Sequence, residues 1–187
     1  MTATSDFAGA AQALAAALSA AAVNPADAIR LLSSLADFTP DDVTSASPIG
    51  LATATMQSAS GDLFRRAAVV AMARASAIYQ PASVDDAAAV RTIVCAALDA
   101  EITIAGDQYE DATYAALRTL RAAVSADLTA RGAGLPSIAT VASNLPLPAL
   151  ALAQRQYRDQ SRSDELVTQS DCIHPAFMPT SFKALSQ

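Results

Sequence analysis

The chain has 187 residues, of which 52% are hydrophobic, and its formal net charge is −6 with a pI near 4.5. This length accommodates one domain, or one domain with a small appendage. The acidic balance argues against direct nucleic-acid binding, because neutralising phosphates requires a basic surface. The excess of acidic residues lies before Leu145, where there are 8 basic and 14 acidic residues. From Leu145 onward there are 4 of each.

Alanine accounts for 47 residues, so the chain favours helices that approach closely but bury little apolar surface per side chain. The two cysteines, Cys95 and Cys172, provide no disulfide framework and fit a reducing compartment. The longest apolar stretch, residues 7–23, is mainly alanine. It is too weakly hydrophobic for a membrane span, and no basic segment of the kind that begins a signal peptide precedes it.

Residues 1–135 are predicted to form an Ala-rich, irregular helical bundle. Asn24 before Pro25 is a favourable helix start, and Ser83 begins another helix with a capping-box-like pattern. Pro81 ends the longest helix, and Gly106 marks a corner between two antiparallel helices. The expected helices span residues 7–22, 25–37, 49–80, 83–106 and 107–132.

Residues 136–187 are predicted to form a separate small module. The β-branched segment 137–141 favours a strand, and residues 147–157 and 164–170 favour two helices separated by a turn. A loop containing Pro175 and Pro179 then leads to a closing strand at 182–185. The predicted fold class is therefore mainly α, with a helical bundle followed by a βααβ module.

Two groups of side chains are candidate reactive sites. Glu101 lies in an apolar stripe near other acids, but their spacing differs from that of a calcium loop, and pairing of Glu101 with Arg118 or Arg121 is expected. His174 is the single histidine, and Cys172 alone beside it does not make a metal site. We expect no catalytic residue, no metal site and no cofactor.

The module resembles LysM domains and the small tail protein of P2-type phages. Tyr157-Arg158-Asp159 matches the Tyr-Gly-Asp that ends the family's first helix, with arginine in place of glycine. The run from Ile173 to Pro179 matches the family's His-Pro-Gly-Phe-x-Pro segment. If the replaced glycine has a positive φ, Arg158 is strained by roughly 1 kcal/mol or the turn differs.

Together with Asn24-Pro25-Ala26-Asp27-Ala28, the module also resembles the C-terminal part of phage Mu-type DNA circularization proteins, which are tail and baseplate components. Members of that family have a further β-rich N-terminal region, which is not recognisable in this sequence. The resemblance implies a non-enzymatic structural protein of a phage or prophage contractile tail, located in the virion tail and docked to other tail or baseplate proteins. A homo-oligomer is an open alternative for its assembly.

Two other functions remain open from the sequence: peptidoglycan binding, which is the usual LysM activity, and binding of DNA ends from injected phage DNA. If the chain is a structural tail protein, Tyr157 and Phe177 are expected to be buried in the module's core. The residues expected to form its core or its interface are Leu150, Tyr157, Asp159, Leu166, His174, Pro175, Phe177 and Pro179.

Overall fold

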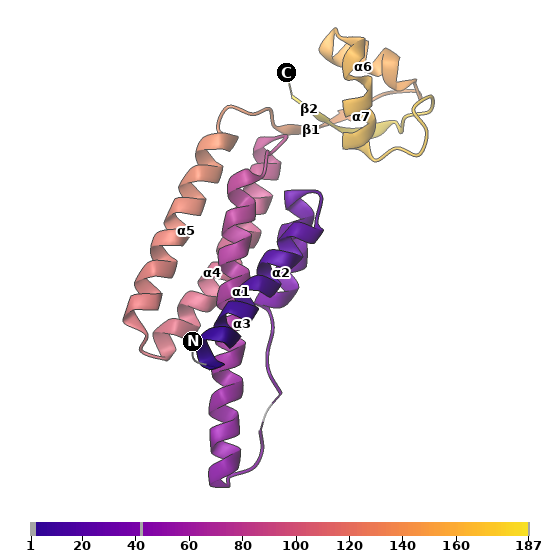
Figure 1. Cartoon of the computed structure of the whole chain (residues 1–187). Coiled ribbons are helices and arrows are strands. Elements are labelled where there is room, and N and C mark those ends of the chain that lie inside the picture. The colour runs from indigo at the N-terminus through magenta and orange to yellow at the C-terminus, as the bar shows by residue number, and fades with distance from the viewer. Residues whose placement is uncertain (1–2, 42, 187) are drawn as a thin grey trace. The chain divides into compact units, whose positions relative to one another are not determined.

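The computed structural model describes residues 3–41 and 43–186, which fold mainly into helices with one small sheet (Figure 1). The chain divides into two compact units. The helical unit comprises Met1–Gln80 and Ala88–Ala130, and the C-terminal unit comprises Pro81–Ala87 and Arg131–Gln187. The C-terminal unit thus begins slightly earlier than expected and also includes the first turn of a helix from the preceding region.

Within the described residues, the helical unit contains five helices at almost the expected positions. They are α1 (Ala3–Ala21), α2 (Pro25–Ala36), α3 (Pro48–Ile78), α4 (Val84–Asp107), whose first turn belongs to the C-terminal unit, and α5 (Asp111–Gly132). Asn24 Oδ1 accepts a hydrogen bond from the Ala26 amide, as a capping side chain does. The helices share a core that includes Leu32, Met72, Val94, Leu98, Leu117 and Leu128.

Alanine lets α1 lie close to α2 and α3, as its abundance predicted. Ala11 and Ala15 are the buried residues of α1 in the described chain, whereas Leu14 is 44% exposed. At one end, Phe7 and Phe38 each meet the Phe64 ring edge-on, with centroids 5.9 and 5.7 Å apart. These aromatic contacts join α1 and the segment after α2 to the middle of α3.

The C-terminal unit is a two-stranded antiparallel sheet with helices against it. Strand β1 (Ile138–Ala142) pairs with β2 (Ser181–Leu185), and Ile138 lies opposite Leu185. Between them lie α6 (Ala149–Tyr157), a 3-10 turn (Gln160–Arg162) and α7 (Ser163–Ser170). The expected fold class, mainly α with a small C-terminal βααβ module, is confirmed.

The start of α4 holds the first strand of this unit in place. The Val84 amide donates to the Pro136 carbonyl over 3.1 Å, and the Ile138 amide donates to Asp85 Oδ2 over 2.6 Å. Ser83 Oγ accepts from the Asp86 amide, which is the predicted cap. The first turn of α4 is therefore structurally part of the C-terminal unit.

Candidate functional site

The residues expected to form the site all lie in the C-terminal unit, on α6, α7 and the loops beside them. The unit's own core is formed by α6, α7, β2 and the loop before β2, and its buried members are Ala149, Leu152, Leu166, Met178, Phe182 and Ala184. Leu166 is fully buried, in agreement with its expected core position. Leu150, the neighbour of Ala149 on α6, is 57% exposed and therefore belongs to the surface.

Tyr157 is partly buried at the end of α6, where it packs against this core. The guanidinium carbon of Arg162 lies 3.8 Å from the centre of its ring, a cation–π contact. The hydroxyl is buried near the backbone of Leu185 but makes no well-formed hydrogen bond. Burial, followed by the charge of Glu165, raises the pKa of Tyr157 above its ordinary value.

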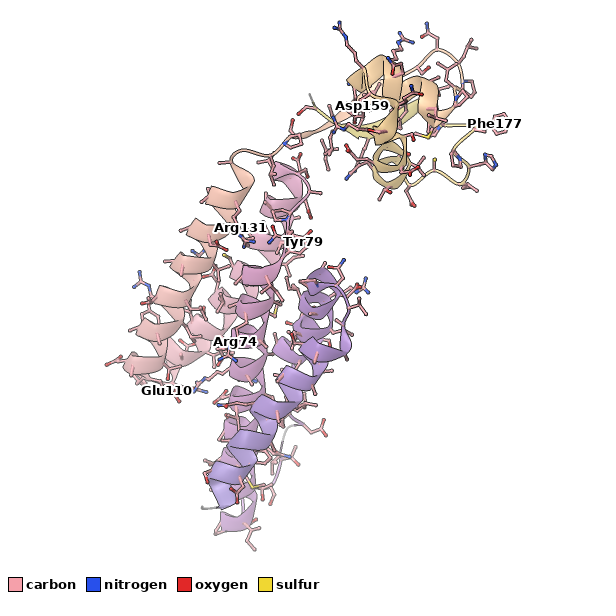
Figure 2. All side chains as sticks on the ribbon, turned by 45° about the horizontal axis from the view of Figure 1, so that its top comes forward. Arg74, Tyr79, Glu110, Arg131, Asp159 and Phe177 are labelled. Atoms are coloured by element: carbon pink, nitrogen blue, oxygen red, sulfur yellow. The ribbon has the colours of Figure 1, made fainter. Side chains whose placement is uncertain are left out.

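The prediction that Phe177 is buried in the core is wrong, because its side chain is 74% exposed and points away from the unit (Figure 2). The next residue, Met178, is fully buried instead, and its amide donates to the Leu147 carbonyl. His174 to Phe177 form a turn, in which the Phe177 amide donates to the His174 carbonyl; this turn leaves the Phe177 ring in solvent, and Met178 enters the core after it. The core phenylalanine is Phe182 on β2, which is 5% exposed.

His174 and Pro175 shape the loop that carries Phe177. His174 Nδ1 accepts a hydrogen bond from the Ala176 amide, and its carbonyl accepts one from the Phe177 amide. The His174 and Phe177 rings lie 5.8 Å apart. The Pro175 carbonyl accepts a 2.7 Å bond from the Ala149 amide. His174 is thus a turn element, and Pro179 is an exposed residue just before β2.

Asp159 is an exposed residue that fixes the turn between the two helices. Its Oδ1 accepts hydrogen bonds from the Ser161 hydroxyl at 2.7 Å and the Ser161 amide at 2.9 Å. These bonds lower the pKa of Asp159. Arg158, just before it, has φ 57° and ψ 21°, which is the left-handed conformation. The position where the resemblance places a glycine therefore has a positive φ, and the arginine is strained.

Two loops of the unit are joined by backbone hydrogen bonds and expose large apolar side chains. The loop before α6 is bonded to the loop before β2 through the Ala149–Pro175 and Leu147–Met178 contacts. We call the exposed apolar residues on and beside these loops the loop surface; they are Leu145, Leu150, Ile173 and Phe177, with exposures of 67%, 57%, 104% and 74%. Sequence reasoning missed Leu145 and Ile173, although both are apolar residues in proline-rich loops.

The helical unit contains a second group of polar side chains, centred on Glu101 of α4. Glu101 is 2% exposed, and it accepts from Arg65 Nε at 3.1 Å and from Arg66 Nε at 2.9 Å. The expected pairing with Arg118 or Arg121 is therefore wrong. Arg121 pairs with Asp99 instead, and Arg118 lies over the Tyr114 ring. The Glu101 side chain faces α3 rather than α5.

The partners of Glu101 have further contacts of their own. Arg65 also binds Asp62 and the Phe38 carbonyl, and Arg66 also binds Glu110 and Gln108. A cleft of about 510 Å³ lies beside this network. Its walls come from the end of α2, the segment after it, α3 and α4. Since each charge in the network already has a partner, the network joins α3 to α4 and leaves no charge free for a ligand.

No helix in the described part of the chain is long and apolar enough to span a membrane. Residues 3–41 and 43–186 include no group of three or more His, Cys, Asp or Glu side chains that could hold a metal ion. No protein-family model and no curated protein sequence matches the chain.

Proposed function

We propose that the chain is a non-enzymatic structural component of a phage or prophage contractile tail, close to the baseplate, and that it docks onto neighbouring tail subunits through its C-terminal unit. The observation that carries this proposal is the loop surface. Leu145, Ile173 and Phe177 are solvated on loops that backbone hydrogen bonds hold together, and Leu150 is exposed beside them in the first turn of α6. Exposed apolar clusters of this kind are typical of protein-binding sites.

The charges of the C-terminal unit suit protein docking. The region from Leu145 onward contains equal numbers of acidic and basic residues, so it neither attracts nor repels polyanions strongly. Arg162 is already engaged by Glu165 and Tyr157. Binding energy from this unit would therefore come mainly from burial of the loop surface, with Phe177 as its largest side chain.

The βααβ order and the left-handed Arg158 support the resemblance to LysM-like tail modules. A glycine would adopt the Arg158 conformation without steric cost, and the family has a glycine at this position. The resemblance extends the proposal from protein docking in general to a place in a tail.

The test uses tail particles purified from a host that carries the gene, with the chain bearing an epitope tag. We expect the tagged chain to co-purify with contractile tails and to be detected near the baseplate by immunoelectron microscopy. Phe177→Ser should lower its amount in particles at least tenfold, whereas the control Ile78→Ser, at an exposed position of the helical unit, should not. Absence of the wild-type chain from intact particles would contradict the proposal.

Peptidoglycan binding is a second candidate because the rings of His174 and Phe177 are both exposed on the same loop. Exposed rings offer apolar faces to sugars. Sedimentation with purified peptidoglycan separates the two functions. If the full chain is retained, and Phe177→Ala abolishes that retention while the chain is also missing from tail particles, the glycan function replaces the structural one.

A further inference from the structure

The hydrogen-bond register of the sheet determines which backbone groups of β1 point away from β2. The Ser143 amide donates to the Thr180 carbonyl, and the Ser186 amide donates to the Ser137 carbonyl, each over 2.7 Å. In an antiparallel pair only every second residue of a strand bonds to its neighbour, and Ser137 and Ser143 fix that set as the odd-numbered residues. The even-numbered residues of β1 therefore direct their N–H and C=O groups to the other side, which we call the outer edge.

One end of the outer edge already has a partner. The Ile138 amide donates to Asp85 Oδ2 over 2.6 Å, as an outward-pointing amide can. The other two residues of the edge, Thr140 and Ala142, are exposed, and no described residue hydrogen-bonds to their outward backbone groups. Two N–H and two C=O groups are thus open for pairing with another strand.

The sequence of β1 lacks the features that usually prevent an edge strand from pairing. Natural edges are commonly protected by a charged side chain, a proline or a bulge. The run Ile-Ala-Thr-Val-Ala contains no charged residue and no proline, and its register with β2 is continuous over all five residues. Isoleucine, threonine and valine are β-branched and favour an extended backbone. The strand is therefore suited to accept a third strand.

A cleft lies at the Ala142 end of this edge, between β1 and α6. It has a volume of about 150 Å³, and it is lined by Val141, Ala142, Ser143, Leu152, Arg155, Gln156 and Phe182. Leu152 and Phe182 are core residues of the unit, and Val141 packs against them, so part of the cleft wall is apolar. A strand paired with the outer edge would place every second side chain on the same face of the sheet as Val141, beside the cleft.

Arg155 supplies a positive charge at this cleft. Its side chain is exposed and has no salt bridge or hydrogen bond to any described residue. Neither strand contains an acidic residue, and Asp85 occupies the opposite end of the edge. A carboxylate on an added strand would therefore be attracted to the Ala142 end and repelled from the Ile138 end.

We infer that the outer edge binds an extended segment of a partner protein, which adds to the sheet as a third strand and places an aspartate or glutamate side chain against Arg155. Hydrogen bonds to Thr140 and Ala142 supply the pairing, and the cleft and Arg155 select the side chains. An open row of both donors and acceptors is matched by another extended backbone, whereas phosphate groups cannot donate to the C=O groups. The inference does not depend on the role of the loop surface in a tail.

The experiment is an NMR titration of the isotopically labelled full chain with an unlabelled peptide. The probe is acetyl-Thr-Val-Thr-Val-Thr-Glu-Thr-amide, in which the valines and the glutamate share one face of a strand. Its binding should shift the amide signals of Thr140 and Ala142 and slow the exchange of these amide hydrogens with solvent. The exchange of Val141 should change little, because its amide already faces β2.

Two altered peptides separate the backbone contribution from the charge. A peptide that is N-methylated at the amides facing the edge should not bind, because it cannot form the ladder. Replacing the glutamate by glutamine should weaken binding about fivefold, as expected for the loss of one exposed ion pair. These two comparisons leave the protein unaltered, so a folding defect cannot explain them.

Variants of the chain test the same two contributions from the other side. Thr140→Pro removes the outward N–H without touching a bond to β2, and it should abolish peptide binding. Thr140→Ala, which keeps the N–H, is the matched control and should bind as wild type does. Arg155→Glu should reverse the charge preference, so that a peptide with lysine in place of glutamate binds more tightly than the original.

Several outcomes would overturn the inference. Absence of shifts at roughly 1 mM peptide would show that the edge does not bind a strand of this kind. Unchanged binding of the N-methylated peptide, or of the original peptide to Thr140→Pro, would place the contact elsewhere. Equal affinities for the glutamate, glutamine and lysine peptides would remove the acidic partner. Self-association of wild type that Thr140→Pro abolishes, without peptide binding, would make a second copy the occupant instead.

Discussion

Arg66 and Glu101 face each other across α3 and α4, with Nε 2.9 Å from Oε1 and the carboxylate almost completely buried. Arg65 approaches the other carboxylate oxygen from the preceding position on α3. A buried carboxylate requires such partners, because transfer from water into the protein costs several kcal/mol per ion. This cluster therefore fixes which faces of α3 and α4 meet.

Removing Glu101 should strongly destabilise the helical unit, because Arg65 and Arg66 then remain beside an empty site. For Glu101→Ala we expect a loss of about 3–5 kcal/mol in the free energy of unfolding, measured by urea denaturation. Asp99→Ala is the control: it breaks the exposed pair with Arg121 and should leave the transition midpoint close to wild type. Equal effects of the two substitutions would contradict a structural role for the buried cluster.

Truncation to alanine should lower stability strongly at Met178 and only slightly at its neighbour Phe177. Met178→Ala opens a cavity in the C-terminal unit and should cost about 2–5 kcal/mol. Phe177→Ala removes a ring that is already mostly in water and should change stability little. Hydrogen exchange of peptides from α6 and α7 reports on this unit specifically. Faster exchange in the Phe177 variant than in the Met178 variant would show that the assigned orientations are reversed.

Replacing Arg158 by glycine should stabilise the turn after α6. The left-handed conformation of residue 158 costs a residue with a side chain about 1–2 kcal/mol. Glycine avoids this steric cost, but it loses more backbone entropy on folding, which offsets part of the gain. We expect a net gain of about 0.5–1 kcal/mol in thermal or chemical unfolding. Arg155→Gly, inside α6, is the matched control and should destabilise by about 1 kcal/mol. If both substitutions destabilise, the turn does not require a positive φ.

Tyr157 should make the C-terminal unit sensitive to alkaline pH. Its pKa is raised in the folded state, so its contribution to stability is complete below the unfolded pKa of about 10 and is lost as the pH rises through the higher folded value. Tyr157→Phe should flatten this alkaline decline. At neutral pH, Tyr157→Phe should change the free energy of unfolding little, because the buried hydroxyl has no well-formed hydrogen bond to lose.

The unfolding free energy of both forms, measured by denaturant titration between neutral pH and pH 11, checks this prediction. Tyr109→Phe is the control, because Tyr109 is 91% exposed and should leave the pH profile unchanged. A Tyr157→Phe profile that follows wild type throughout would show that another group governs the alkaline decline.

Local signals in the sequence predicted most of the fold. Capping at Asn24 and Ser83, the prolines at the start of α2 and after α3, and the corner near Gly106 act within a few residues. The helix bounds therefore agree with the structure to within about three residues at most ends. The βααβ order was equally accessible from short-range patterns. The same signals did not reveal that the first turn of α4 belongs to the C-terminal unit, because hydrogen bonds of Val84 and Asp85 to residues some fifty positions later create that association.

The site was predicted less well, because it depends on which way particular side chains point. Glu101 was assigned to the arginines of α5, but a carboxylate in an apolar stripe pairs with whichever helix that stripe meets, and helix packing decides this. The position of Phe177 between Pro175 and Pro179 predicts that its ring is anchored in the core. The turn from His174 to Phe177 leaves the ring in solvent, and the flexible Met178 fills the core position instead.

The pairing of Ile138 with Leu185 places the beginning of β1 and the end of β2 side by side. Tension applied between these two ends would act on the sheet hydrogen bonds one after another, starting with the outermost, rather than on all of them in shear. If the chain works in an assembly that contracts, force is best transmitted through its helices, and this sheet would open first.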